Sequence, residues 1–250
     1  MFTTVAYYQV LPPNSPPTPI TPIPDPHIRV EGKNIIVPEG MNYYLGCRLI
    51  TNTYNPAYLD APSLRRFMYH WIDGSSEDQA TTITTPFDNR FYNPLPLDNF
   101  EPLRIVGDNP STTSERYWVA VVFIGDGPQV PVTGDIYTVK TMGTGTIRAY
   151  QWSNVSLSFT DTLPAGRYQL VGAAVPYGGV IAVRFVFVGQ AWRPGVLGRG
   201  GYYRVGPDIF RHGRLGVFGE FPHDQPPTVD VLSGVDMGEV AIFLDLIKVG

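Results

Sequence analysis

Apolar and polar residues alternate with a period of two along many short segments of the chain. Within residues 152–159, positions 155, 157 and 159 are apolar, whereas 153, 156 and 158 are polar. This pattern is typical of a β-strand with one face in water. Residues 119–124 are apolar throughout, as in a strand that is buried on both faces. Predicted strands cover 1–10, 28–37, 41–51, 101–106, 117–124, 135–140, 145–159, 167–176, 180–188, 215–218, 228–232 and 239–248.

Short strands separated by glycine and proline turns are typical of antiparallel sandwiches and barrels. The chain has 26 glycines and 25 prolines among 250 residues, and because proline breaks helix interiors, this composition excludes a mainly helical protein. A glycine- and proline-containing break at 125–131 falls halfway along the chain. We therefore predict an all-β fold of two tandem antiparallel β-sandwiches, over 1–127 and 128–250, with long loops such as 73–116.

One segment has a helical period instead. From Pro62 to Gly74, apolar residues fall at positions 64, 67, 68, 71 and 72, which is the spacing of a helix that buries one face. Asp60 and Pro62 are typical residues for a helix start, and Gly74 for its end. We predict one short helix over 62–74, and a strand over 67–72 is the alternative.

A proline-rich segment follows the first predicted strand. Residues 11–27 contain eight prolines, which fix the backbone in an extended form and remove hydrogen-bond donors. The segment is expected to be stiff and extended. It either reaches a neighbouring subunit as an arm, with Pro16 and Pro19 at the interface, or lies on its own domain as a connector.

Few residues are arranged for chemistry. Cys47 is the single cysteine, so an intrachain disulfide and a cysteine-based zinc cluster are excluded, and we expect it to be buried. The four histidines have no metal-ligand spacing, and no nucleophile elbow is present. We predict no catalytic residue, no cofactor site and no metal site. Residues 143–146 are predicted to form a hairpin turn, and the acidic residues of 73–78, beside Trp71, are either a solvated loop or half of a sugar site.

The net charge and the hydropathy of the sequence limit the kinds of partner that we expect for this chain. A formal charge of −4 disfavours a protein that coats DNA or RNA, because such proteins neutralise phosphates with surplus cations. No stretch has the form of a signal peptide or the roughly 18 apolar residues of a membrane span, so we expect a soluble protein.

Arginines are concentrated in one segment. Fifteen arginines stand against three lysines in the chain, and five of the arginines fall within 193–214 beside the single acid Asp208. Arginine is enriched at interfaces because its planar group makes paired hydrogen bonds with carboxylates. We predict intersubunit ion pairs with acidic loops such as 73–78; a solvated loop and a nucleic-acid contact are the alternatives. The predicted interface residues are Arg193, Arg199, Arg204, Arg211, Arg214, Pro16 and Pro19.

Three segments of the second half carry a family resemblance. They are residues 163–172 (LPAGRYQLVG), residues 182–187 (AVRFVF) and the turn Arg193-Pro194-Gly195. Together with the strand pattern of 152–159, they resemble the C-terminal roll of double jelly-roll major capsid proteins. Those proteins build the shells of tailless icosahedral bacteriophages and other viruses, many of which have an internal membrane.

This resemblance implies a structural role. It implies a double jelly roll that forms a homotrimer with a pseudo-hexameric outline, in contact with neighbouring capsomers, minor capsid proteins and, where one exists, an internal viral membrane. It further implies a place in the virion after assembly in the host cytoplasm, without enzymatic activity, cofactor or sequence-specific nucleic acid. The alternative is a receptor- or carbohydrate-binding β-sandwich of a virion spike or minor capsid protein, which would carry an exposed aromatic platform.

Overall fold

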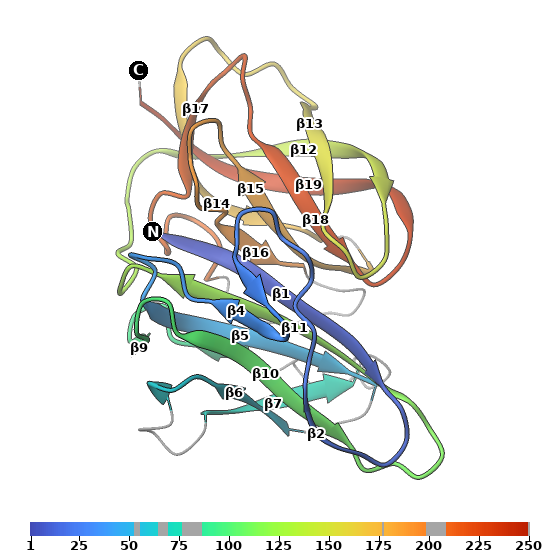
Figure 1. The fold of residues 1–250 in the computed structure, drawn as a ribbon. Helices are drawn as coiled ribbons and strands as arrows, with labels where there is room; N and C mark the ends of the chain where they lie inside the picture. Colours follow the sequence, from blue (N-terminus) through green and yellow to red (C-terminus); the bar gives the residue numbers. More distant parts are fainter. Residues whose placement is uncertain (53–55, 65–69, 77–86, 177, 199–208, 250) are drawn as a thin grey trace. The chain divides into compact units, whose positions relative to one another are not determined.

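The computed structural model describes residues 1–52, 56–64, 70–76, 87–176, 178–198 and 209–249 (Figure 1). The chain divides into two compact units, which we call the N-terminal unit (Thr4–Pro128) and the C-terminal unit (Gln129–Gly250 with Met1–Thr3). None of the described residues lies in an α-helix. The prediction of an all-β fold is therefore confirmed.

The N-terminal unit is built from eleven described strands. Their path runs β1-β11-β5-β7-β6-β10-β4-β3, with β2 beside β10 and both β8 and β9 beside β5. β5 and β7 run parallel, contrary to the expectation of purely antiparallel sheets. The strands are β1 (Phe2–Leu11), β2 (Ser15–Pro19), β3 (Val30–Glu31), β4 (Asn34–Ile36), β5 (Tyr43–Thr51), β6 (Pro56–Asp60), β7 (His70–Ser76), β8 (Phe87–Asn89), β9 (Leu95–Pro96), β10 (Pro102–Asn109) and β11 (Arg116–Gly125).

The prediction of a short helix over 62–74 is wrong. Ala61 and Leu64 close a turn through a backbone hydrogen bond of 3.0 Å, residues 65–69 lie outside the described part of the chain, and His70–Ser76 is strand β7. β7 pairs with β6 on one side and with β5 on the other. Pairing with strands on both sides therefore overrides the local helical spacing.

The proline-rich segment lies on its own unit. β2 pairs antiparallel with β10 and, among the described strands, with no other, as expected of a strand that lacks donors. Beyond β2, the backbone nitrogen of Ile20 donates to the carbonyl of Ile105 at 2.8 Å. The amide of Asn109 donates to the carbonyls of Leu11 and Pro12, at 3.0 Å each. Within this chain, the segment is therefore a packed connector.

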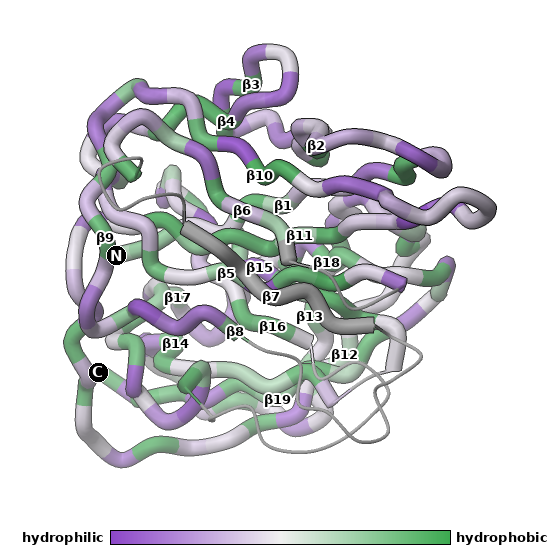
Figure 2. The backbone as a smooth tube through the Cα atoms, turned by 90° about the horizontal axis from the view of Figure 1, so that it is seen from below, coloured by the Kyte–Doolittle hydropathy of each residue, from purple (hydrophilic) through white to green (hydrophobic). Residues whose placement is uncertain are grey.

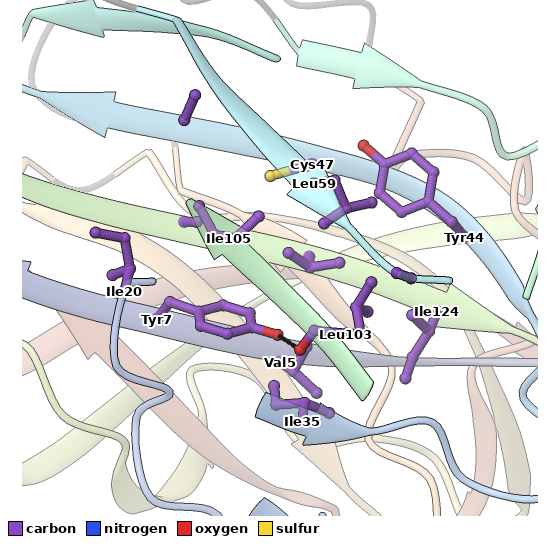
Figure 3. Close-up of a cluster of buried hydrophobic side chains, with 14 of the residues drawn as sticks. Val5, Tyr7, Ile20, Ile35, Tyr44, Cys47, Leu59, Leu103, Ile105 and Ile124 are labelled. Atoms are coloured by element: carbon purple, nitrogen blue, oxygen red, sulfur yellow. Dashed lines mark hydrogen bonds between the residues drawn. The ribbon is translucent and has the colours of Figure 1, made fainter. Parts of the chain in front are cut away.

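Apolar side chains from six strands of the N-terminal unit meet in one core. Figure 3 shows Tyr7 among them, with its hydroxyl donating to the carbonyl of Leu103 at 2.8 Å. Burial first, and the neighbouring Cys47 second, raise the pKa of Tyr7 well above its usual 10.0, so the hydroxyl stays protonated and donates. Trp118, also part of this core, is fully buried. Residues 119–124 are buried throughout, as predicted.

The C-terminal unit forms an 8-stranded sheet in its described part, with the order β16-β15-β18-β13-β12-β19-β14-β17. β13 alternates between buried and exposed residues, which confirms the period-two prediction. In the N-terminal unit, by contrast, Figure 2 shows a hydrophobic stretch along β11 and a hydrophilic turn between β3 and β4. The strands of this unit are β12 (Ile136–Ile147), β13 (Ser153–Phe159), β14 (Arg167–Ala174), β15 (Val180–Val186), β16 (Gly195–Leu197), β17 (Gly219–Pro222), β18 (Thr228–Ser233) and β19 (Met237–Lys248).

The predicted hairpin turn at 143–146 is wrong, because these residues lie inside β12. The pairing of β12 with β19 shifts register between Thr144 and Ile147, which is a bulge in a long strand. A side chain at position 143 would place its Cβ 2.8 Å from a methyl group of Val155. Gly143 is therefore required for the close approach of β13, not for a turn.

The core hydrogen bond of Tyr7 gives a stability prediction. Tyr7→Phe removes the donor to the Leu103 carbonyl and is expected to lower the free energy of unfolding by about 1 kcal/mol. Urea unfolding followed by tryptophan fluorescence measures it. Tyr137→Phe is the control, because Tyr137 is exposed, and its change should stay within about 0.5 kcal/mol. Equal midpoints for the two variants would contradict this role.

Candidate functional site

Asp230 is a buried carboxylate on β18, and it binds side chains from three of the segments that carry the family resemblance, 152–159, 182–187 and 193–195. In the sheet register, Asp230 lies opposite Arg184 of β15 on one side and opposite Asn154 of β13 on the other. Arg184 Nε donates to Asp230 Oδ2 at 2.9 Å, and Asn154 Nδ2 donates to Oδ1 at 2.8 Å. Arg193 Nη1 also donates to Oδ2. Two guanidinium groups therefore share one carboxylate.

The charged groups at the centre of this network are buried, so they have to be paired with one another. The side chain of Arg184 is 1% exposed and that of Asp230 is 6% exposed. The guanidinium carbon of Arg184 lies 4.3 Å from the ring centroid of Trp152, in cation–π contact. A charge removed from water has to be paired and hydrogen-bonded, or it destabilises the fold by several kcal/mol. Asp230 is thus a staple between β13, β15 and the turn that leads into β16.

A second buried carboxylate, Asp245 of β19, fastens a loop onto the sheet. Arg211 donates to it twice, from Nε at 2.6 Å and from Nη2 at 2.8 Å. The backbone nitrogen of His212 and the hydroxyl of Thr138 donate to it as well, at 2.9 and 2.7 Å. On β14, a Cβ at Gly172 would lie 2.9 Å from both the Arg211 Cα and the Asp245 carboxylate. Glycine at this position lets the loop approach the sheet.

The donors around Asp245 determine its acidity. Burial by itself raises the pKa of this carboxyl, but the hydrogen bonds from Arg211, the His212 backbone and Thr138, together with the charge of Arg211, outweigh burial. The pKa of Asp245 is therefore lowered from its usual 3.8. The carboxylate is ionised at neutral pH and serves as an acceptor.

The predicted interface residues separate into three groups. Arg193 and Arg211 hold the buried carboxylates Asp230 and Asp245 of their own unit. Arg214 and Pro16 are exposed and Pro19 is half-buried. Arg199 and Arg204 lie outside the described residues. An intersubunit role for these positions stays a prediction.

Sequence patterns alone missed the two acids that organise this unit. Each stands singly in an apolar strand, in the runs 229–231 (VDV) and 244–246 (LDL). A lone acid in such a run is a signal that could have identified them, because a buried carboxylate needs a cationic partner. Asp73, which was considered for a sugar site, belongs to strand β7, and residues 77 and 78 lie outside the described part.

Cys47 is fully buried, as predicted. Burial, and secondly the charge of Asp88, raise the pKa of its thiol well above the usual 9.0, so this cysteine is protonated at neutral pH. Within the described residues, no group of three or more histidine, cysteine or acidic side chains is placed to hold a metal ion. In the same part of the chain, no helix has the length and apolar character needed to cross a membrane.

The Asp230 staple predicts a large difference between two carboxylate variants. Asp230→Asn leaves two guanidinium groups without a counter-charge and should lower the free energy of unfolding by about 3–5 kcal/mol. The control is Asp236→Asn, because Asp236 pairs with Arg148 at 3.5 Å and both side chains are mostly exposed; its cost should be about 0–1 kcal/mol. Denaturant unfolding compares them, and similar losses from both variants would contradict the staple.

The lowered pKa of Asp245 predicts a pH dependence. Because the folded-state pKa lies below the unfolded value, the stabilisation is complete above the unfolded pKa and is lost as the pH falls through the folded-state pKa. Asp245→Asn should therefore be less stable than the parent at neutral pH, and the difference should shrink below roughly pH 4. Thermal melts across pH measure this difference. A constant gap down to acid unfolding is the outcome that argues against it.

No family model matches the sequence, and no curated protein matches it. Among solved structures, the chain is similar to the major capsid protein P2 from bacteriophage PM2. The two are 11% identical, and the match covers 100% of this chain and 98% of that chain with a TM-score of 0.29. A score this low does not establish a shared fold, so the function has to be argued from the chain's own residues.

Proposed function

We propose that this chain is a major capsid protein, the structural subunit of an icosahedral viral shell. In this proposal each unit is a jelly roll, over 1–127 and 128–250, and three copies form a pseudo-hexameric capsomer. The capsomer contacts its neighbours and minor capsid proteins in the virion. One observation carries the proposal: three of the four segments that resemble capsid rolls, 152–159, 182–187 and 193–195, meet in the network centred on Asp230.

The residues that distinguish these segments have structural tasks in the C-terminal unit. In the first segment, Tyr168 is buried, stacks on Phe221 with ring centroids 6.0 Å apart, and donates its hydroxyl to the carbonyl of Pro164 at 2.7 Å. In the second and third segments, Arg184 and Arg193 share Asp230. The motif residues therefore hold a β-unit in one arrangement, which is what a shell subunit requires of them.

The buried carboxylates and the thiol have structural roles, as expected of a structural protein. Among the described residues of the C-terminal unit, the buried carboxylates Asp230 and Asp245 are each paired with arginine donors. The single thiol is protonated in the core. Each of these groups is used in folding, so we extend the proposal to a protein without enzymatic activity.

The mass of the purified chain in solution tests the proposal. Light scattering should give three times 27.7 kDa, because obligate capsomer interfaces bury more than roughly 2,000 Å². A particle of 27.7 kDa at every concentration contradicts the proposal. A monomer that binds immobilised glycans would instead support the receptor- or carbohydrate-binding alternative.

A further inference from the structure

An exposed aromatic residue of the N-terminal unit is held in an unfavourable backbone conformation. Phe100, in the connection between β9 and β10, has a φ of +64° and is 60% exposed. In the left-handed region, a side chain crowds the backbone, so glycine and asparagine are the usual residues there. A bulky residue in this conformation persists only where its surroundings impose it.

Hydrogen bonds on both sides of Phe100 impose this conformation. The nitrogen of Phe100 donates to the carbonyl of Val37 at 2.9 Å, and the nitrogen of Val37 donates to the carbonyl of Glu101 at 3.0 Å. The Glu101 carboxylate is buried and accepts from the backbone nitrogens of Asp98 and Ser63, at 2.9 Å each. These hydrogen bonds therefore hold the backbone at position 100 in one conformation, whichever side chain is present there.

The side chain at this position contributes little to its own subunit. Its ring is mostly in water, where an apolar surface gains nothing from burial. Glycine or asparagine would keep the turn and relieve the backbone. Phenylalanine is therefore explained by a contact outside the subunit, where aromatic residues are enriched because they bury a large area with few rotatable bonds.

The charge distribution indicates the partner. The N-terminal unit has 8 Lys and Arg against 13 Asp and Glu, a net charge of −5, whereas the C-terminal unit has 10 against 9, a net charge of +1. The exposed acids Glu39 and Asp98 flank Phe100, since Gly40 donates to the Asn99 side chain. An acidic rim around an apolar ring favours an apolar surface with cationic neighbours.

The C-terminal unit carries such groups. Val188 is 91% exposed and Val130 is 73% exposed. Val188 stands in a tight turn that Gln190 and Phe187 close through a backbone hydrogen bond of 3.3 Å. Arg167 of the same unit is exposed but pairs with Glu220 at 3.6 Å. Arg214 is exposed and lies two residues before Gly216, where a Cβ would stand 2.9 Å from the carbonyl of Val130. Gln190 Nε2 donates to the carbonyl of Phe218 at 2.9 Å, so the turn of Val188 and the chain at Val130 both adjoin residues 214–218, which include the exposed Arg214.

We propose that the Phe100 ring is an intersubunit contact that packs on the C-terminal unit of a second copy of this chain, against the exposed valines Val130 and Val188. Because unlike units meet, the contact is heterologous, and three such contacts close a ring when each rotates the next copy by a third of a turn. The inference rests on the proposed function, and it adds the residue and the surface through which the trimer forms.

The test separates backbone relief from the loss of the ring. Phe100→Gly and Phe100→Asn should leave the melting temperature of the dissociated subunit unchanged or raise it, while weakening trimer association at least tenfold in sedimentation equilibrium. Val188→Asp should weaken association to a similar degree. Tyr137→Thr, which removes another exposed ring from a strand of ordinary geometry, is the control and should leave association within twofold.

Each result decides the proposal. Trimers of Phe100→Gly as stable as the parent's would overturn the inference and leave the proposed function standing. Normal association of Val188→Asp beside weakened Phe100→Gly would overturn the assignment of the partner surface. A parent chain that stays monomeric would overturn both the inference and the proposed function.

Discussion

Two guanidinium groups and one amide converge on Asp230, and a carboxylate taken out of water has to be paired in this way. The register of three strands follows, because Arg184 and Asn154 reach Asp230 only when β15 and β13 lie opposite it in their observed alignment. Arg193 then brings in the turn that leads into β16. Buried pairs of this kind add less to stability than to specificity, since they make misaligned arrangements costly.

The local sequence pattern was sufficient to predict a strand where the burial of its faces alone determines the structure. β13 followed from alternation and β11 from an uninterrupted apolar run, because the burial of one or both faces leaves a mark on the sequence itself. β7 did not follow, because its apolar spacing also fits a helix and its strand form depends on pairing with β5 and β6, which lie outside the segment itself. The glycines of β12 suggested a turn, although Gly143 makes room for Val155.

The candidate sites were harder to predict than the strands. Arginine enrichment predicted Arg193 and Arg211 to be interface residues, whereas in the folded chain they pair with Asp230 and Asp245 of their own unit, 37 and 34 residues away along the chain. Phe100 was not identified at all, because its backbone conformation results from hydrogen bonds to Val37 and Glu101 that only the folded chain assembles. Interactions across the fold leave weak traces in a single sequence.

If the chain is a capsid subunit, three copies should assemble into a particle with a hexagonal outline. The buried carboxylates Asp230 and Asp245 would keep the C-terminal unit rigid, and the exposed groups of the two units would join copies to one another. Negative-stain electron microscopy of the purified chain tests this claim most directly. Particles with a hexagonal outline built from three subunits are the predicted result, and a field of single monomers would contradict the account.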